Sequence, residues 1–344
     1  MAMMRLGIID LGTNSVRFDV QELGPGRRIH RLHREKRMIR LGQGVFLHGR
    51  LDRNAMRRTL GAFLRFRQAA EALGAKRIVA FATSALREAT DNERLLGLIR
   101  RRAGIELRII SGEEEARLIA RGILAHERVR RGRFALVDIG GGSTEISVCR
   151  GRSALRSASF DLGTSRLQQL FLRRSPPSRR IVRDLRTHIR TTLRRTIAAE
   201  GWPGASHVLG SSGTVRALAK ILRKRGGGRT IERRTLSRLV SEMARMNPKD
   251  LARLPGIEPH RVDMILAGGI LLEECMRALG AGTVAPTPYA LRDGILEEER
   301  RRARSRVRGR GEAAQRSAGG VAAATTNPGT SGKSSSTLSS VLVP

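Results

Sequence analysis

Apolar and polar residues alternate with two different spacings along the first part of the chain, which predicts strands and helices in turn. Short apolar runs at residues 6–9 and 16–21 are typical of strands. Over residues 54–73 the apolar positions recur at helical spacing and predict an amphipathic helix. The further elements expected in this part are strands at 77–82 and 106–110 and helices at 93–101 and 111–125.

The second part of the chain repeats this succession and ends in a segment of different character. Residues 134–138 and 145–149 predict two strands, and a strand at 207–209 leads into a helix. Strands and helices mixed within two similar halves indicate an α/β fold. From about residue 306 apolar periodicity disappears, so residues 306–344 are expected to be disordered. The other elements expected are a strand at 154–161, helices from 165 and over 180–199, and helices through the remainder to about 304.

The charge of the chain makes it a natural partner for polyanions. It carries 66 Lys and Arg residues against 31 Asp and Glu, a formal net charge of +35. Its two cysteines, Cys149 and Cys275, form neither a disulfide framework nor a metal-ligand spacing. The N-terminal apolar run lacks the features of a signal peptide, and the longest later one, residues 264–272, is too short to span a bilayer. We therefore expect a soluble, cytoplasmic protein with no membrane partner.

Two segments of the chain, residues 7–15 (GIIDLGTNS) and 136–144 (LVDIGGGST), are versions of one another. Each is an apolar β-prone run followed by an aspartate, Asp10 or Asp138, and by a small flexible turn with hydroxyl groups. Such a segment delivers a carboxylate and a row of backbone N–H groups to one place. The repeat predicts a duplicated fold whose halves face each other across a phosphate-binding cleft.

Three glycine-containing turns are candidates for binding phosphate. Glycines at 140–142 let the backbone approach a ligand and direct several N–H groups into one concavity. Asn14 and Ser15 supply the same chemistry in the first turn, and residues 210–214 (GSSGT) offer a third loop between a strand and a helix. Glycines that only make tight turns explain any one loop, but three loops that each follow a strand and carry Ser or Thr favour phosphate binding.

Acidic residues beside these turns suit a magnesium ion. Asp10 and Asp138 end apolar strands, where a free carboxylate is costly unless it meets a cation or donors. Glu145 lies just past the second turn, and hard oxygen ligands beside phosphate are typical of Mg²⁺ sites. We expect Asp138 and Glu145 to bind Mg²⁺, with Asp10 as a further ligand, although both aspartates also suit the capping of their own turns.

The helix expected at 111–125 opens with three acids. Ser111 and Glu114 have capping-box spacing, and the helix dipole alone favours acids in a first turn. Glu115 differs because it shares a stripe with Ile119 on the apolar face. A carboxylate there points inward or into a cleft, where its pKa can rise, as a general base for water requires. Spacing alone leaves both interpretations open.

Arginines are so frequent in this chain that any single one is weak evidence for a site. Arg87 stands out because residues 82–87 (ATSALR) follow a strand and begin a helix, where a guanidinium group can clamp phosphate bidentately. For Arg17, Arg166 and Arg292 a solvated or ion-paired side chain is the favoured interpretation.

These motifs resemble those of the exopolyphosphatase / guanosine pentaphosphate phosphohydrolase (Ppx/GppA) family, within the sugar kinase–actin–Hsp70 superfamily. The resemblance implies two ribonuclease-H-like (actin-like ATPase) domains, at residues 1–122 and 123–305, with the site in the interdomain cleft and the last helix packed back on the first domain. It covers roughly residues 5–300 and rests on segments 9–15, 82–87, 111–119, 137–145, 210–214 and 291–294.

The resemblance also implies roles for single residues. The family's catalytic glutamate directly precedes an Ala-Arg pair and falls on Glu115. Its metal-associated acids fall on Asp138 and Glu145, and Arg87 matches a phosphate-contacting arginine. The phosphate loops fall on Asn14, Ser15, Gly141, Gly142, Ser143, Ser212 and Gly213. The implied reaction is Mg²⁺-dependent hydrolysis of the terminal phosphoanhydride bond of inorganic polyphosphate, and we expect a homodimer.

Two alternatives stay open at this point. One keeps the catalyst and changes the substrate to guanosine pentaphosphate, which would lose its terminal phosphate at the same loops. The other is a non-enzymatic RNA-binding protein held to its ligand by charge. A single Trp and a single Tyr leave few stacking platforms for bases, so we expect nucleic acid to bind only non-specifically.

Overall fold

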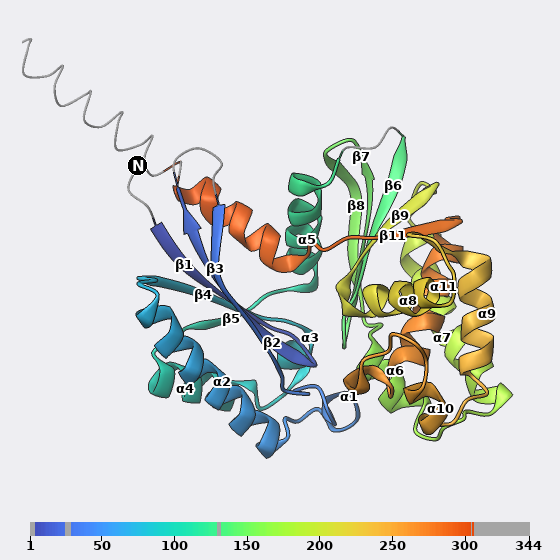
Figure 1. Cartoon of the computed structure of the whole chain (residues 1–344), viewed down its shortest axis with the longest axis horizontal. Helices are drawn as coiled ribbons and strands as arrows, with labels where there is room; N and C mark the ends of the chain where they lie inside the picture. The colour runs from blue at the N-terminus through green and yellow to red at the C-terminus, as the bar shows by residue number, and fades with distance from the viewer. Residues whose placement is uncertain (1–3, 25–28, 129–131, 304, 306–344) are drawn as a thin grey trace, which may run out of the picture. The chain divides into compact units, whose positions relative to one another are not determined.

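The computed structural model describes residues 4–24, 29–128, 132–303 and 305. One compact unit extends to Glu298 and contains two mixed sheets with flanking helices (Figure 1). The short remainder of the described chain, from Glu299, continues as helix. The predicted α/β class is confirmed, whereas the tail at 306–344 lies outside the described residues.

The first sheet is built from the N-terminal part of the chain, and we call it with its helices lobe I. Its strands run in the order β3-β2-β1-β4-β5, with β1, β2 and β3 antiparallel and β1, β4 and β5 parallel. The bounds are β1 Met4–Leu11, β2 Ser15–Leu23, β3 Ile29–Met38, β4 Arg77–Ala82 and β5 Leu107–Ile109. The helices of this lobe are α1 Val45–His48, α2 Arg53–Ala72, α3 Ser84–Glu88 and α4 Asn92–Ala103.

The two faces of the first sheet are covered by different helices because side chains alternate along each strand. Ile9 and Leu11 of β1 belong to the core that α2 and α4 complete, in which Phe18 stacks on Phe66 at 4.9 Å between ring centroids. Leu6 and the residues that share its face enter a second core. Each such buried side chain contributes about 1.5–3 kcal/mol.

The second sheet, with its helices, forms lobe II. Its strand order is β10-β11-β9-β6-β7-β8, in which β6 and β7 form an antiparallel hairpin and β9 lies parallel to β6. The strands are β6 Arg133–Ile139, β7 Thr144–Arg150, β8 Ser153–Phe160, β9 His207–Ser211, β10 Ile231–Glu232 and β11 Thr283–Pro286. The helices are α6 Thr164–Phe171, α7 Arg179–Ile197, α8 Ser212–Lys224, α9 Arg233–Met243, α10 Pro248–Ala252, the 3-10 turn η1 Pro259–Arg261 and α11 Ile265–Ala278.

Helix α5, Gly112–His126, and the helical residues 291–298 lie between the two sheets (Figure 1). One core joins Leu6 of β1, Ile123 of α5 and Phe134 of β6. The backbones come very close here, because a Cβ on Gly122 would lie 2.5 Å from the backbone nitrogen of Gly294. The boundary expected at residue 122 falls inside α5, a helix that contributes to both sheets' packing.

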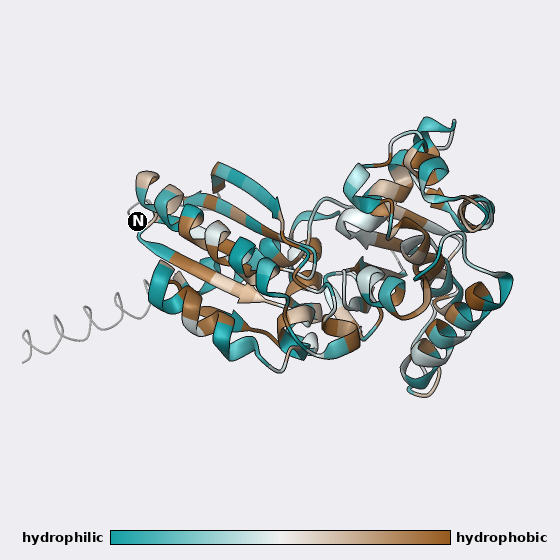
Figure 2. Ribbon diagram, turned by 90° about the horizontal axis from the view of Figure 1, so that it is seen from below, coloured by the Kyte–Doolittle hydropathy of each residue, from teal (hydrophilic) through white to brown (hydrophobic). Residues whose placement is uncertain are grey.

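Most of the expected helices and strands are present, with two differences. The C-terminal part is not helical throughout, since β11 pairs in parallel with β9. Strand β3 was not expected, because its sequence, IHRLHREKRM, has no sustained apolar alternation. It lies at the sheet edge, where charged side chains are tolerated. Figure 2 shows polar residues along such edges and apolar residues concentrated in the sheets and on the sheet-facing sides of helices.

Candidate active site

The repeated segments form two hairpins with the same backbone geometry. In β1–β2 Asp10 pairs with Arg17, and in β6–β7 Asp138 pairs with Glu145. Each turn closes with an equivalent hydrogen bond, from the Gly12 N–H to the Ser15 carbonyl at 3.0 Å and from the Gly140 N–H to the Ser143 carbonyl at 2.9 Å. The duplication that the sequence predicts is therefore present in strand register and in turn geometry.

The tips of the two hairpins touch. A Cβ built on Gly141 would lie 2.7 Å from Cβ of Thr13 and 2.8 Å from Nδ2 of Asn14. Real side chains do not approach so closely, so only glycine fits at this point of contact. A cleft that opens to solvent lies at the junction and is lined by both turns and by Glu115.

The turn at 140–143 is held so that its amide groups face away from α6. In a trans peptide the C=O of one residue and the N–H of the next point in opposite directions. Because all three carbonyls of residues 140–142 turn toward the start of α6, the N–H groups of the following residues point the other way. The bonds are Thr164 N to Gly140 O at 3.0 Å, Ser165 N to Gly141 O at 2.8 Å and Arg166 Nε to Gly142 O at 2.7 Å.

The turn of lobe I is also held by hydrogen bonds to its carbonyl groups. The Asn14 carbonyl accepts hydrogen bonds from the N–H groups of Ile39 and Arg40, each at 2.9 Å, and the Thr13 carbonyl accepts from Gly42 at 2.9 Å. Arg40 adopts a left-handed backbone with φ 54°, a conformation that is costly for a non-glycine residue. The N–H groups after both carbonyls are thereby turned away from the 39–42 loop, toward the cleft that these turns line.

The third loop joins β9 to α8. Ser212 has a left-handed backbone, φ 93°, and its hydroxyl accepts from the N–H groups of Thr214 and Val215 at 3.1 and 3.3 Å. The Ser212 side chain thus caps α8, whereas Gly213 and Thr214 line the cleft. This loop presents one glycine amide and one hydroxyl beside the two hairpin tips.

The aspartates of the two hairpins differ in the residue that lies opposite each of them. Asp10 accepts a hydrogen bond from Arg17 at 3.2 Å. Asp138 faces the second acid, Glu145, which accepts from the hydroxyl of Ser159 at 2.8 Å. Burial raises the pKa of Asp138, and burial together with the charge of Asp138 raises the pKa of Glu145 to about 7. Two buried carboxylates without a cation are unfavourable, so the pair favours a bound cation.

Glu115 is buried at the start of α5 and lines the cleft. The hydroxyl of Ser111 caps this helix by accepting from Glu114 N at 3.1 Å, as the capping pattern predicts. Burial, and after it the charge of Glu145, raises the pKa of Glu115 well above its ordinary value. Arg87 opposes that shift by donating to Glu115 at 3.3 Å, while it also donates to the Ile110 carbonyl at 2.8 Å.

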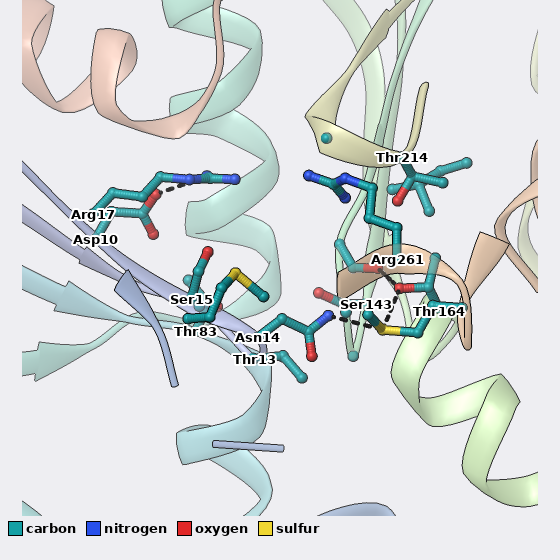
Figure 3. Close-up of a pocket in the computed structure, with 18 of the residues that line it drawn as sticks. Asp10, Thr13, Asn14, Ser15, Arg17, Thr83, Ser143, Thr164, Thr214 and Arg261 are labelled. Atoms are coloured by element: carbon teal, nitrogen blue, oxygen red, sulfur yellow. Dashed lines mark hydrogen bonds and ion pairs between the residues drawn. The ribbon is translucent and has the colours of Figure 1, made fainter. Parts of the chain in front are cut away.

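The remaining side of the cleft is basic. Arg17 and Arg261 extend toward one another from opposite lobes (Figure 3). Lys36 and His260 also line the cleft. Desolvation, and after it the charge of Arg261, lowers the pKa of Lys36 to about 8. Desolvation and the charge of Arg17 likewise lower the pKa of Arg216. Crowded like charges of this kind are relieved by an anion.

The comparisons with known proteins agree with this site. The family described as Ppx/GppA phosphatase matches residues 19–303. The chain belongs to the Ppx/GppA phosphatase family. It is therefore a hydrolase of bonds to phosphate, and the resemblance noted from its motifs is confirmed.

Several relatives of this chain carry exopolyphosphatase names. Exopolyphosphatase 1 of Mycobacterium tuberculosis is 31% identical over 302 residues, which cover 85% of this chain and 87% of the relative. Exopolyphosphatase 2 of the same organism is 32% identical, with 86% and 98% covered. The crystal structure of an exopolyphosphatase from Cytophaga hutchinsonii is 25% identical, with a TM-score of 0.78 over 86% of this chain and 97% of that one. The two-domain, actin-like fold expected for a Ppx/GppA protein is confirmed by these structures.

The structure brings most of the residues predicted for a Ppx/GppA site to one cleft. The predicted residues that line it are Asp10, Asn14, Ser15, Glu115, Gly141, Gly142, Ser143 and Gly213. Four predicted residues are not part of this lining: Asp138, Glu145, Ser212 and Arg87. Two lining residues reach the acids of this group. The charge of Arg17 lowers the pKa of Asp138, and a hydrogen bond from Ser143 lowers the pKa of Glu145. Arg87 here contacts Glu115, so its predicted phosphate contact stays a prediction.

Sequence reasoning missed the basic side of the cleft. Lys36 comes from the unexpected strand β3, and His260 and Arg261 come from the 3-10 turn η1. No sequence motif surrounds these residues. They are significant only because the fold brings them together in the cleft from distant parts of the chain. Arg166 was set aside as a solvated or ion-paired arginine. It is buried and ion-paired, and it contacts the 140–143 turn.

Two of the acids at this Ppx/GppA site suit a metal ion. Within residues 4–24, 29–128, 132–303 and 305, no three His, Cys, Asp or Glu side chains converge as a metal-binding group. The pair Asp138 and Glu145 fits Mg²⁺, which binds through one or two carboxylates, waters and substrate phosphates. Asp10 is engaged by Arg17 instead. In the same described ranges, no helix has the length and apolar character needed to cross a membrane.

Proposed function

We propose that the protein is a Mg²⁺-dependent exopolyphosphatase that hydrolyses the terminal phosphoanhydride bond of inorganic polyphosphate and releases orthophosphate. The names of the relatives support this substrate. The observation that carries the proposal is the contact of two equivalent turns, at Thr13 and Gly141, beside a buried Glu115 in a cleft with basic walls.

The terminal phosphate is held by backbone amides. The N–H groups of Asn14 and Ser15 from lobe I and those of 141–143 from lobe II turn away from the carbonyl bonds that anchor each loop. Such concavities of N–H groups bind phosphate oxygens and need no reorganisation during the reaction. Because both lobes contribute, the phosphate is completely held only when the lobes are together.

The rest of the polyphosphate chain meets the basic side of the cleft. Arg17, Lys36 and Arg261 line it, and Arg216 adds its charge. A chain with one charge or more on each phosphate replaces the repulsion among these cations by attraction. This contribution should weaken as salt screens the charges.

Glu115 acts as the general base for the attacking water. Its raised pKa makes its carboxylate a stronger proton acceptor near neutral pH than an exposed glutamate. Arg87 holds the carboxylate in place and keeps a share of it ionised, since its charge lowers the pKa. The proton removed from water passes to the Glu115 carboxylate, and the new oxygen–phosphorus bond replaces the bond to the leaving phosphate.

Asp138 and Glu145 would hold the Mg²⁺ ion. When bound, the ion supplies positive charge that neutralises the charge developing on the phosphate oxygens. Ser159 and Ser143 orient the Glu145 carboxylate through hydrogen bonds. Because Glu145 has a pKa of about 7, its carboxylate ionises and becomes available to the ion as pH rises through that value.

The test is hydrolysis by Glu115→Gln, which keeps the shape of the side chain and removes the base. Losing a general base costs about 10²–10⁴ in rate, and we expect turnover to fall by that amount while tripolyphosphate still binds. Phosphate release and calorimetric binding are measured with and without Mg²⁺. Glu114→Gln is the matched control. Glu114 is next to Glu115 in the chain, and its carboxylate contacts Arg108 at the surface. Wild-type hydrolysis by Glu115→Gln would refute the role of this residue.

Guanosine pentaphosphate is the second candidate substrate. The cleft also has apolar side chains from Met38, Ile265 and Leu291, which a phosphate chain does not need and a guanine base would contact. Turnover of guanosine pentaphosphate and polyphosphate side by side distinguishes the two. The proposal also includes a homodimer and only non-specific nucleic-acid binding, which sedimentation and salt-dependent RNA binding would test.

A further inference from the structure

Arg166 lies where the phosphate turn of lobe II meets helices α1 and α3 of lobe I. Its Nε donates to the Gly142 carbonyl at 2.7 Å. Its Nη1 donates to Glu88 of α3 at 3.0 Å, and Nη2 bonds the same carboxylate. The guanidinium carbon also sits 4.4 Å from the ring centroid of Phe46 in α1. The side chain is buried, with 8% of the residue exposed.

The bond to Gly142 differs from the other two that anchor the turn. Residues 140 and 141 are anchored by backbone N–H groups of α6, which belong to lobe II and stay in place whatever the lobes do. Gly142 is anchored by the side chain of Arg166, which contacts Glu88 and Phe46 of lobe I and, at 3.3 Å, Asp161 of lobe II. The orientation of the peptide that carries the Ser143 N–H therefore depends on how Arg166 is held.

Helix α3 links this anchor to the base. Two adjacent residues of this helix make the link. Arg87 donates a hydrogen bond to Glu115, the proposed base, and Glu88 accepts one from Arg166, which holds the turn. Ser84, at the start of the same helix, packs so closely that a Cβ on Gly142 would lie 2.2 Å from its hydroxyl oxygen. Helix α3 thus contacts Glu115 through Arg87 and the 140–143 turn through Ser84.

We infer that Arg166 is a positioning residue that aims the Ser143 N–H into the cleft only while the lobes are closed; this rests on the proposed phosphate hydrolysis at that turn. When the lobes separate, Glu88 and Phe46 move away from the guanidinium group. The partner left on lobe II is Asp161, at 3.3 Å, whose carboxylate is exposed. Arg166 then swings toward Asp161 and releases the Gly142 carbonyl.

Coupling between lobe closure and the direction of the Ser143 N–H would make hydrolysis depend on closure. An open enzyme lacks one aimed amide donor, so it holds the terminal phosphate poorly and does not stabilise charge on it. Closure restores the donor and brings Glu88 and Arg87 into register with the turn. Hydrolysis is therefore confined to the closed state, in which the phosphate contacts both hairpin tips.

The main experiment compares kcat and KM of Arg166→Gln, Glu88→Gln and wild type on polyphosphate. A misplaced catalytic group costs up to about 10²-fold, so we expect Arg166→Gln to lower kcat by about 10- to 100-fold with a smaller change in KM. Glu88→Gln keeps one hydrogen bond to Arg166 and should lower kcat less. Because both substitutions disrupt the same Arg166–Glu88 contact, their effects should not add. The kcat of the double variant should fall no further than that of Arg166→Gln alone.

Asp263→Asn is the matched control for lobe closure. It removes a different ion pair between the lobes, in which Asp263 contacts the side chain of Arg40 at 3.2 Å. Because that pair is exposed, kcat should stay within about twofold of wild type. An equal loss of kcat in Asp263→Asn and Arg166→Gln would overturn the inference, since closure alone would then explain both.

Amide hydrogen exchange gives a readout that does not depend on substrate. The segment 140–143 should exchange faster in Arg166→Gln than in wild type or in Asp263→Asn, with circular dichroism unchanged. Unchanged exchange in Arg166→Gln, or wild-type kcat in both Arg166→Gln and Glu88→Gln, would overturn the positioning role. A wild-type protein that releases no phosphate from polyphosphate would instead refute the proposed function, while the exchange result would still decide on Arg166.

Discussion

The hairpins β1–β2 and β6–β7 share one backbone geometry and differ in the residue opposite the aspartate. In lobe I Arg17 stands opposite Asp10 and donates to it at 3.2 Å. In lobe II Glu145 stands opposite Asp138, and both carboxyl groups have a raised pKa. The difference teaches that turn geometry and charge are separable. Both hairpins have the same turn, but only the second places two acids opposite one another, with raised pKa values despite the opposing charges of Arg17 and Arg216.

The surroundings of the two hairpins extend this division. Arg292 donates to Asp19 at 2.6 Å and lies 4.0 Å from Asp10, so the buried aspartates of β1 and β2 are paired with arginines. In lobe II the acid pair lies next to Glu115, whose pKa it helps to raise. This contrast supports the proposal that lobe II holds the cation and that lobe I contributes mainly to substrate binding.

The largest expected effect concerns the acid pair. Glu145→Gln should lower kcat by about 10²–10³-fold and weaken the dependence of the rate on Mg²⁺, because preorganised charge at the developing negative oxygens is lost. Asp10→Asn is the comparison in lobe I and should leave the Mg²⁺ concentration for half-maximal rate nearly unchanged. Steady-state rates over a Mg²⁺ titration provide the measurement. A larger Mg²⁺ effect in Asp10→Asn would reverse the assignment of the two lobes.

The next effect concerns the contact between the tips. Gly141→Ala would bring a Cβ to 2.7 Å from Thr13 and 2.8 Å from Asn14, so the tips must separate. We expect kcat/KM to fall by about 10²-fold, the cost of a misplacement near 1 Å. Gly282→Ala is the control, since its added Cβ would meet nothing within 4 Å. Equal kinetics of the two variants would show that the tips do not share one phosphate.

A smaller effect is expected at the residue that distinguishes lobe I. Arg17→Gln leaves Asp10 without its partner and removes one cation from the cleft. Hydrogen bonds to charged groups contribute about 1.5–3 kcal/mol, so KM for polyphosphate should rise by about tenfold or more while kcat changes less. Arg5→Gln, which breaks the exposed pair with Glu22 in the same hairpin, serves as the control. A loss confined to kcat would contradict the binding role of lobe I.

The smallest effect is a pH dependence of binding. Desolvation, and after it the charge of Arg261, lowers the pKa of Lys36 to about 8, below its ordinary value of 10.5. The ammonium group is present below this pH and loses its proton as pH rises through it, so KM should rise a few-fold between pH 7 and 9. Lys36→Met should flatten that rise without changing kcat. The same rise in Lys36→Met would assign the titration to another group.

The sequence predicted the parts of the site that are local in the chain. The strand–turn–strand repeats around Asp10 and Asp138 have a fixed register, so a pattern of residues determines where the aspartates and amides lie. Helical periodicity placed Glu115 on an apolar face without deciding its role, and the resemblance to the family's motif selected it; the structure buries it there. Such features require no knowledge of how the lobes pack.

The parts that sequence did not predict depend on pairing between distant segments. Lys36 lies on an edge strand whose alternating charges resemble a solvated segment. Arg261 lies in a 3-10 turn without any motif. Arg166 gains its role from Glu88, a residue of the other lobe. With 66 basic residues in the chain, no pattern separates these from arginines that only face solvent.

The most direct test of the account is a crystal structure of Glu115→Gln with tripolyphosphate and Mg²⁺. We predict that the terminal phosphate accepts hydrogen bonds from the amides of both tips, at 14–15 and 141–143, and that the ion is bound by Asp138 and Glu145. A phosphate bound to one tip alone, or an ion on Asp10 with the Asp138–Glu145 pair empty, would contradict the account.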